Sequence, residues 1–269
     1  MPTSKRRGRA HGRAIVKRAQ QQPLIGREVR AWFRSTYGSA WLTLEKRQIE
    51  SVMPLMVGTR LLQVGNWGRG DELLRSSRLL QHWVIGLVDG LGADAITDGT
   101  ALPVLSRSVD AVVLPHALEL VGSPEALVGE SERALVDHGQ LVITGFNPLS
   151  GWGVKRALKA RREGGFPWQS QPLTLLRLRL LLDSHGFDVV RVRRYGLGFP
   201  RLCGDRKTDL ARPIDFACRG LSNAYLVVAR KRVAPLTPIG RVWRPAPKLN
   251  PASLPCRAAA RTRAGREPA

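Results

Sequence analysis

At 269 residues the chain is long enough to bury a substantial core, and its formal net charge is +22 at pH 7. Residues 1–30 hold nine lysines or arginines and one acid, and residues 230–269 hold ten and one, so most of the basicity lies at the two ends. Cys203, Cys218 and Cys256 are odd in number, widely spaced and free of any C-x-x-C, so they indicate neither a disulfide framework nor a zinc site. No apolar run reaches the roughly 20 residues that cross a bilayer.

Both ends are predicted to be flexible arms, residues 1–30 and 232–269, because neither has the apolar periodicity that offsets the entropy of ordering. Their charge suits nonspecific contact with nucleic acid or another polyanion, and a plain solubilising extension is the alternative. The basic start also fits an organelle transit peptide, although it is poor in serine. Because no hydrophobic signal segment follows it and the histidines are scattered, we expect a cytoplasmic protein with no membrane span and no metal.

Apolar periodicity divides residues 31–231 into alternating helices and strands. Gly58 is expected to close the first helix. In chain order the first half is predicted to hold a helix over 41–57, a strand over 61–64, a helix over 71–81, a strand over 83–88 that leads into Asp89, and a short segment over 93–98.

The second half ends differently, because no helix separates its last two strands. Ser123 and Pro124 suit the N-cap and first turn of a helix, and Gly139 is expected to end it. The predicted elements are a strand over 109–114, a helix over 124–136, a strand over 140–145, a helix over 173–184 and strands over 187–194 and 224–231, with a helical insert at about 147–170 and a loop at 195–223. This order predicts an α/β fold with a mostly parallel sheet covered on both faces and an antiparallel last strand pair.

The stretch from Leu61 to Gly70 is an apolar strand that breaks into three glycines before an amphipathic segment. Such a sequence is typical of a buried strand that turns into a helix whose N-terminal N–H groups face a ligand. Glycines allow positive φ there and let a bound molecule approach the backbone. The spacing is G-x-x-G-x-G rather than the G-x-G-x-x-G of dinucleotide folds, and a purely structural turn is the alternative.

Three blocks within residues 55–231, at 61–70, 98–112 and 116–119, together resemble the class I S-adenosylmethionine-dependent methyltransferases. Leu61 to Gly70 is similar to their first glycine motif, and His116-Ala117-Leu118-Glu119 precedes the helix after Ser123. The block from Asp98 to Val112 resembles the D-A-x-x-L-P-F…S-F-D-x-V signature of the type 11 subgroup, and Glu125 to Gly145 resembles its R-x-L-k-p-G-G-x-L-x-i block. The resemblance implies a Rossmann-like three-layer sandwich that binds S-adenosyl-L-methionine and methylates an unidentified acceptor.

The resemblance also implies where the cofactor lies, across the carboxyl ends of the strands. An acid after the second strand, Asp89, would bind the ribose hydroxyls, and Asp98, followed by Gly99, would accept from the adenine amino group. Leu114 and Pro115 would form the wall nearest the sulfonium. The backbone that would meet the amino-acid part of the cofactor is that of Gly65, Asn66, Trp67 and Gly68.

Each of these assignments has a structural alternative. Asp89 and Asp98 both precede a glycine and could simply make turns. His116 is expected to be a neutral structural histidine at a strand end, with a catalytic base as the alternative. Trp67 could pack on a cofactor or on the sheet.

The chain also departs from the family pattern at several positions. Gln63 stands where the family often has an acid, and Trp67 and Arg69 replace two glycines. The gap between Asp89 and Asp98 is too short for the usual helix between the second and third strands. The cofactor pocket is therefore expected to be remodelled, or degenerate so that binding is lost.

Three functions stay open. The block at 98–112 favours an active methyltransferase, whereas the altered glycine loop favours a silent methyltransferase-like module that binds nucleic acid or another polyanion through its arms. A nucleotide-dependent oxidoreductase is the third, but the chain lacks the glycine spacing expected for that class. Residues 147–170 and 195–223 are the segments expected to hold an acceptor. Basic residues from Lys155 to Arg162 could attract an anionic acceptor or form a solvated face.

Overall fold

The computed structural model describes residues 28–29, 31–67, 73–74, 76–87, 92–154, 171–196 and 222–233. The chain divides after Val233, and all of the described residues belong to the first unit, Met1–Val233. Predictions for Gly68, Asp89 and most of residues 1–30, 147–170, 195–223 and 232–269 lie outside the described residues.

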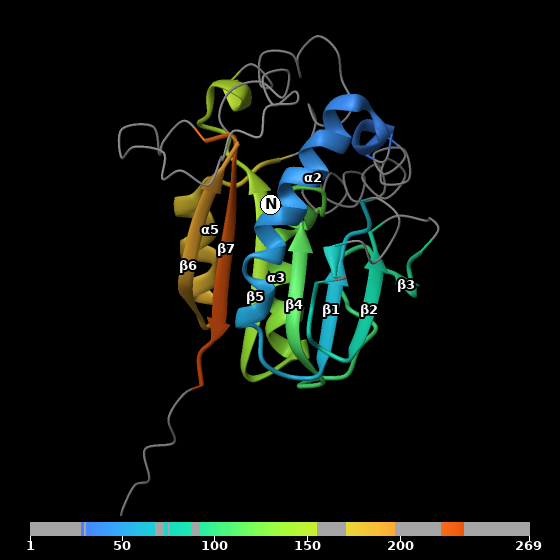
Figure 1. The fold of residues 1–269 in the computed structure, drawn as a ribbon. Helices are drawn as coiled ribbons and strands as arrows, with labels where there is room; N and C mark the ends of the chain where they lie inside the picture. Colours follow the sequence, from blue (N-terminus) through green and yellow to red (C-terminus); the bar gives the residue numbers. More distant parts are fainter. Residues whose placement is uncertain are drawn as a thin grey trace, which may run out of the picture. The chain divides into compact units, whose positions relative to one another are not determined.

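A seven-stranded sheet in the order β3-β2-β1-β4-β5-β7-β6 forms the centre of the first unit (Figure 1). Every neighbouring pair from β3 to β5 is parallel, whereas β7 runs antiparallel to both β5 and β6. The strands are β1 (Arg60–Val64), β2 (Gln81–Gly86), β3 (Ala95–Ile96), β4 (Val109–Pro115), β5 (Leu135–Phe146), β6 (Phe187–Tyr195) and β7 (Ala224–Lys231). The predicted α/β fold with an antiparallel last pair is confirmed.

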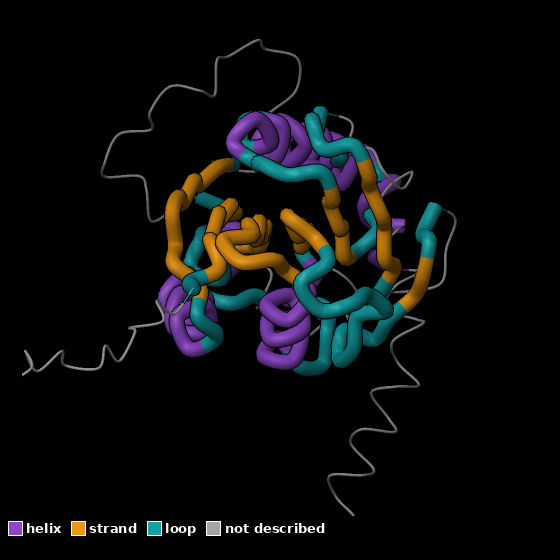
Figure 2. The backbone as a smooth tube through the Cα atoms, turned by 90° about the horizontal axis from the view of Figure 1, so that it is seen from below, coloured by secondary structure: helices purple, strands orange, loops and turns teal. Residues whose placement is uncertain are grey.

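Helices cover both faces of the sheet (Figure 2). Helix α2 (Thr36–Glu50) lies on one face, and α3 (Pro124–Ala134) and α5 (Leu175–Ser184) lie on the other. Each helix starts at a hydroxyl N-cap that accepts a hydrogen bond from a backbone N–H in the first turn. The three caps are Ser35, Ser123 and Thr174. The prediction of Ser123 as an N-cap is therefore confirmed.

The first helix ends earlier than predicted, at Glu50 rather than near residue 57. Pro54 has no backbone N–H to donate to the carbonyl of Glu50, so the α-helical ladder cannot continue, and a short 3-10 turn, Met53–Leu55, follows instead. The helix predicted over 71–81 is also wrong in its described part. Ser77 accepts a hydrogen bond from the N–H of Leu79, which competes with helical bonding, and β2 begins at Gln81.

Helix α3 ends at Ala134, and β5 begins at the next residue, so Gly139 lies inside a strand and does not end the helix. The start of β5 is irregular, because the pairing with β4 shifts between Val109 and Ala111. His138 adopts a positive φ of 62° in this stretch. From Gln140 onward the register is regular, and this regular part is the segment whose apolar pattern predicted the strand.

The central strands are buried on both faces, as expected for a parallel sheet between two helical layers. Residues Ala111 to Leu114 of β4 and Leu141 to Ile143 of β5 are almost entirely inaccessible to solvent. In the described part of the chain, no helix combines the length and apolar character that crossing a membrane requires. Those residues also contain no group of three or more His, Cys, Asp or Glu side chains that could hold a metal ion.

Candidate functional site

The carboxyl ends of β1 and β4 meet at the centre of the sheet, where the strand order reverses. β1 pairs with β2 on one side and with β4 on the other. The connections that follow these strands therefore leave in opposite directions, and an open α/β sheet binds ligands in the crevice formed at such a point. Leu114 and Pro115, predicted to lie next to the sulfonium, are the last two residues of β4, at this edge of the sheet, and both are buried.

Gly65 follows β1 and has a conformation that favours glycine. Its φ is 105°, and its N–H donates to the carbonyl of Ile85 at 2.8 Å. A Cβ at this position would lie 3.2 Å from the carbonyl oxygen of Pro115 and 3.1 Å from Nε1 of Trp67. Gln63 fixes the same turn, since its Nε2 donates to the carbonyl of Gly65 at 2.7 Å. Gln63 therefore has a structural role where the family often has an acid.

Trp67 bridges the ends of β1 and β4. Its side chain is 3% exposed, its indole N–H donates to the carbonyl of Pro115, and its ring stacks on Phe33 at 6.2 Å between centroids. Asn66 beside it is buried as well. Of the two alternatives for Trp67, the structure shows packing against the end of the sheet and against the segment that precedes α2.

Asp98 lies on an exposed loop between β3 and β4. Its Oδ1 accepts from the N–H of Thr100 at 2.8 Å and from the Thr100 hydroxyl at 2.6 Å. These hydrogen bonds lower the pKa of Asp98 below its ordinary value. The next residue, Gly99, is buried with φ 87°, and a Cβ there would lie 2.6 Å from Val121. The turn considered for Asp98 is present, and its exposed carboxylate is ionised at neutral pH.

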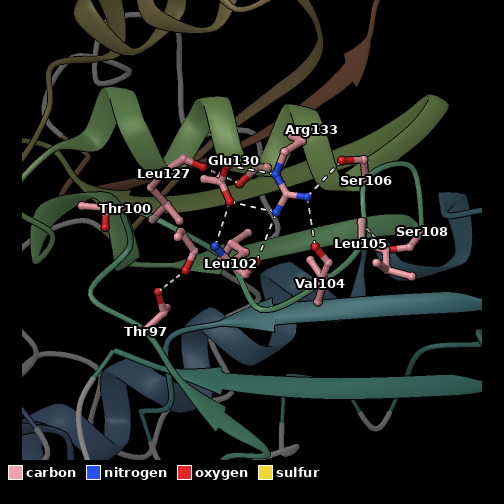
Figure 3. A network of polar contacts seen from close by, with 12 residues as sticks. Thr97, Thr100, Leu102, Val104, Leu105, Ser106, Ser108, Leu127, Glu130 and Arg133 are labelled. Carbon is pink, nitrogen blue, oxygen red and sulfur yellow. Dashed lines mark hydrogen bonds and ion pairs between the residues drawn. The ribbon is translucent and has the colours of Figure 1, made fainter.

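The loop after Asp98 is held by a pair of residues whose role the sequence did not reveal (Figure 3). Arg133 on α3 donates to the carbonyls of Leu102 and Val104 at 3.1 and 3.0 Å, and it forms an ion pair with Glu130 at 2.9 Å. Glu130 in turn accepts from the N–H of Leu102 at 2.8 Å. Arg133 lies in the block at 125–145 and thus fixes the block at 98–112. These are the two blocks that resemble the type 11 subgroup.

Replacing Arg133 with alanine is expected to lower the free energy of unfolding by about 2 kcal/mol, because two carbonyls and a carboxylate lose a charged donor. Chemical denaturation of the purified protein measures this change. Arg47 occupies the last turn of α2 as Arg133 occupies the last turn of α3, and it is exposed. If Arg47→Ala lowers the free energy of unfolding by the same amount, Arg133 does not have a special role in holding the loop.

His116 follows β4 directly and lies between two buried carboxylates. Its φ is 49°, and its ring is fully buried. Nε2 lies 3.3 Å from Oε2 of Glu45, and Nδ1 lies 3.4 Å from Oε1 of Glu119. Burial alone lowers the pKa of His116, but the charges and hydrogen bonds of Glu45 and Glu119 outweigh it and raise the pKa to about 10. The expected neutral histidine is therefore an imidazolium at neutral pH.

The two carboxylates around His116 are fixed by further hydrogen bonds. The Thr144 hydroxyl on β5 donates to Oε1 of Glu45, and the N–H of Phe146 donates to Oε1 of Glu119. Because Glu45 belongs to α2, this buried group joins α2 to the carboxyl ends of β4 and β5. His116, without exposed surface, is a structural residue in this conformation.

Comparison with solved structures gives the class of the fold. A SAM-dependent methyltransferase of Thermotoga maritima, a possible histamine N-methyltransferase, matches with TM-score 0.53 and 14% identity over 81% of this chain and 97% of its own. Geranyl diphosphate C-methyltransferase of Streptomyces coelicolor, in complex with Mg²⁺, geranyl diphosphate and S-adenosyl-L-homocysteine, matches with TM-score 0.51 and 16% identity over 71% and 82%. The chain has the Rossmann-like fold of SAM-dependent methyltransferases.

Comparison of sequences gives the family. The uncharacterized protein YafS of Escherichia coli K12 is 30% identical over 206 residues, which cover 77% of this chain and 82% of YafS. The chain belongs to the same family as YafS. No family model matches the sequence.

Proposed function

We propose that the chain binds S-adenosyl-L-methionine at the carboxyl ends of β1 and β4 and transfers its methyl group to an acceptor. The observation that carries the proposal is Gly65, which adopts a positive φ directly after β1, at the point where strand order reverses. The fold shared with SAM-dependent methyltransferases supports it. The two blocks that resemble the type 11 subgroup, at 98–112 and 125–145, support it further.

The described residues fit such a cofactor in one respect, because Asp98 presents an exposed carboxylate suited to an amino group. Gly65 itself is buried, its N–H and carbonyl are hydrogen-bonded within the protein, and a Cβ there would lie 3.1 Å from Nε1 of Trp67. We assign the adenine end to Asp98 and Gly99, the wall near the sulfonium to Leu114 and Pro115, and the ribose to Asp89. The amino-acid end is assigned to the backbone of Gly65, Asn66, Trp67 and Gly68.

When bound, the cofactor supplies a methyl group on a sulfonium, which is a good leaving group. An acceptor lone pair forms the new bond to the methyl carbon while the electrons of the carbon–sulfur bond return to sulfur. Alignment of the two reactants can supply up to about 7–11 kcal/mol. The protein's own part is to bind and orient, so the burial of His116 away from solvent does not conflict with the proposal.

A silent methyltransferase-like module is the second candidate. Trp67 favours it, because a bulky indole replaces a glycine and takes the hydrogen bond of the Pro115 carbonyl. In that case contact with nucleic acid or another polyanion would fall to the basic arms, residues 1–30 and 232–269. On this alternative the full chain binds polyanions but not the cofactor, and removal of the arms would abolish polyanion binding.

Replacing Asp98 with alanine is expected to weaken S-adenosylmethionine binding by roughly 1–3 kcal/mol, the scale of a lost hydrogen-bond partner. Calorimetric titration of the folded variant measures the change. Thr100→Val is the matched control, because it removes one hydroxyl from the same turn and leaves the carboxylate in place. Equal affinities for the wild type and Asp98→Ala would remove Asp98 from the site.

A further inference from the structure

A pocket of about 290 Å³ opens between the carboxyl end of β5 and the start of α5. Tyr225 at the beginning of β7 closes one side, and its hydroxyl donates to the carbonyl of Leu173 at 2.9 Å. Asn147 and Ser222 also line the pocket. They belong to the two segments, 147–170 and 195–223, in which an acceptor site was expected. The pocket shares the carboxyl edge of the parallel strands with Gly65 but lies farther along the sheet.

The charged residues of this pocket are all basic. Arg179 on α5 and Arg194 on β6 line it, and none of its lining residues is acidic. Arg179 is exposed and, in the described part of the chain, has no ion pair or hydrogen bond. By contrast, Arg177 on the same helix lies 3.5 Å from Glu125. Arg179 therefore brings to the pocket a positive charge that no carboxylate of the described residues neutralises.

Neutral donors add to this charge. Thr174, Leu175 and Leu176 line the pocket and form the N-cap and first turn of α5, which contains no acid. The Thr174 hydroxyl accepts a hydrogen bond from the N–H of Arg177. The N–H groups of Leu175 and Leu176, like those at the start of any helix, have no acceptor within the helix. The positive end of the helix dipole adds to the field of the two arginines.

We propose that this pocket binds an oxyanion, a phosphate or carboxylate group of the methyl acceptor. That the oxyanion belongs to a methyl acceptor rests on the proposed function, whereas binding of an oxyanion in this pocket does not depend on the cofactor. An arginine beside open backbone donors suits an oxyanion, because it supplies charge-assisted hydrogen bonds. An acceptor anchored here by its anionic group would extend along the carboxyl edge of the sheet toward Pro115.

The test uses the full chain without S-adenosylmethionine, with inorganic phosphate and malonate as separate probes. Phenylglyoxal modifies accessible arginines, and mass spectrometry reports the extent at each one. One of the two probes is expected to protect Arg179 and Arg194 while Arg177 stays reactive. Protection by phosphate assigns a phosphate group, and protection by malonate assigns a carboxylate.

Affinity gives the second measurement. Arg179→Gln is expected to weaken binding of the protecting probe roughly tenfold, the scale of one lost hydrogen bond to a charged group, and Arg179→Lys should weaken it less. Arg177→Gln is the matched control, since it removes the same charge from the same helix. Absence of protection at Arg179, or equal losses in Arg177→Gln and Arg179→Gln, would overturn the inference.

The outcomes separate this inference from the proposed function. Protection of Arg179 in a protein that fails to bind S-adenosylmethionine would leave the anion site standing and refute the methyltransferase. Binding of S-adenosylmethionine without protection of Arg179 would support the cofactor site and refute the anion site.

Discussion

Replacing His116 with alanine is expected to lower the free energy of unfolding by about 3–5 kcal/mol. The change leaves the carboxylates of Glu45 and Glu119 buried without their cation, and it breaks the connection between α2 and the ends of β4 and β5. Chemical denaturation monitored by circular dichroism measures the loss. His82→Ala is the control, because His82 is exposed on β2 and its replacement should change stability by less than about 0.5 kcal/mol.

The same residue gives stability a defined dependence on pH. The folded-state pKa of His116 is raised to about 10 from an ordinary value of 6.5, so between these values the folded chain holds a proton that the unfolded chain releases. The stabilisation is complete below pH 6.5 and is lost as the pH rises toward 10, with a slope of up to about 1.4 kcal/mol per pH unit. Unfolding curves of His116→Ala should lack this slope. An equal slope in both proteins would contradict a protonated His116.

Replacing Trp67 with alanine is expected to cost about 3–5 kcal/mol even without any cofactor, because a buried aromatic ring is lost from the ends of β1 and β4. Trp67→Phe retains a ring against Phe33 but leaves the Pro115 carbonyl without its indole donor, so about 1–3 kcal/mol is expected.

Denaturation of the cofactor-free proteins checks both values. Trp83→Ala is the comparison, since Trp83 is 37% exposed and its loss should cost less. If Trp67→Ala costs no more than Trp83→Ala, the indole does not close the strand ends and is available to a ligand.

The parts of the fold that could be predicted are those with strong local patterns. The strands at 61–64, 109–114 and 224–231 are predominantly apolar, and the helix after Ser123 has a cap and a first-turn proline. Boundaries were less reliable where local chemistry competes with periodicity. Pro54 ends the first helical region early, and the Ser77 hydroxyl helps prevent the helix predicted before β2.

The candidate site could be predicted only in part. Gly65 at the end of β1 and Pro115 at the end of β4 follow from the motif and the strand order, and the structure brings them together. The pairing of His116 with Glu45 could not be predicted, because the two residues are distant in sequence and Glu45 fits an ordinary helix pattern. The same is true of Arg133, whose partners are mostly backbone carbonyls that no sequence pattern identifies.

Calorimetric titration of S-adenosylmethionine and S-adenosylhomocysteine into the purified full chain at moderate salt tests the central claim most directly. We expect saturable one-to-one binding in the micromolar range, despite the buried Trp67. Absence of binding to protein that is folded by circular dichroism would contradict the claim, and would identify the chain as a methyltransferase fold that no longer uses the cofactor.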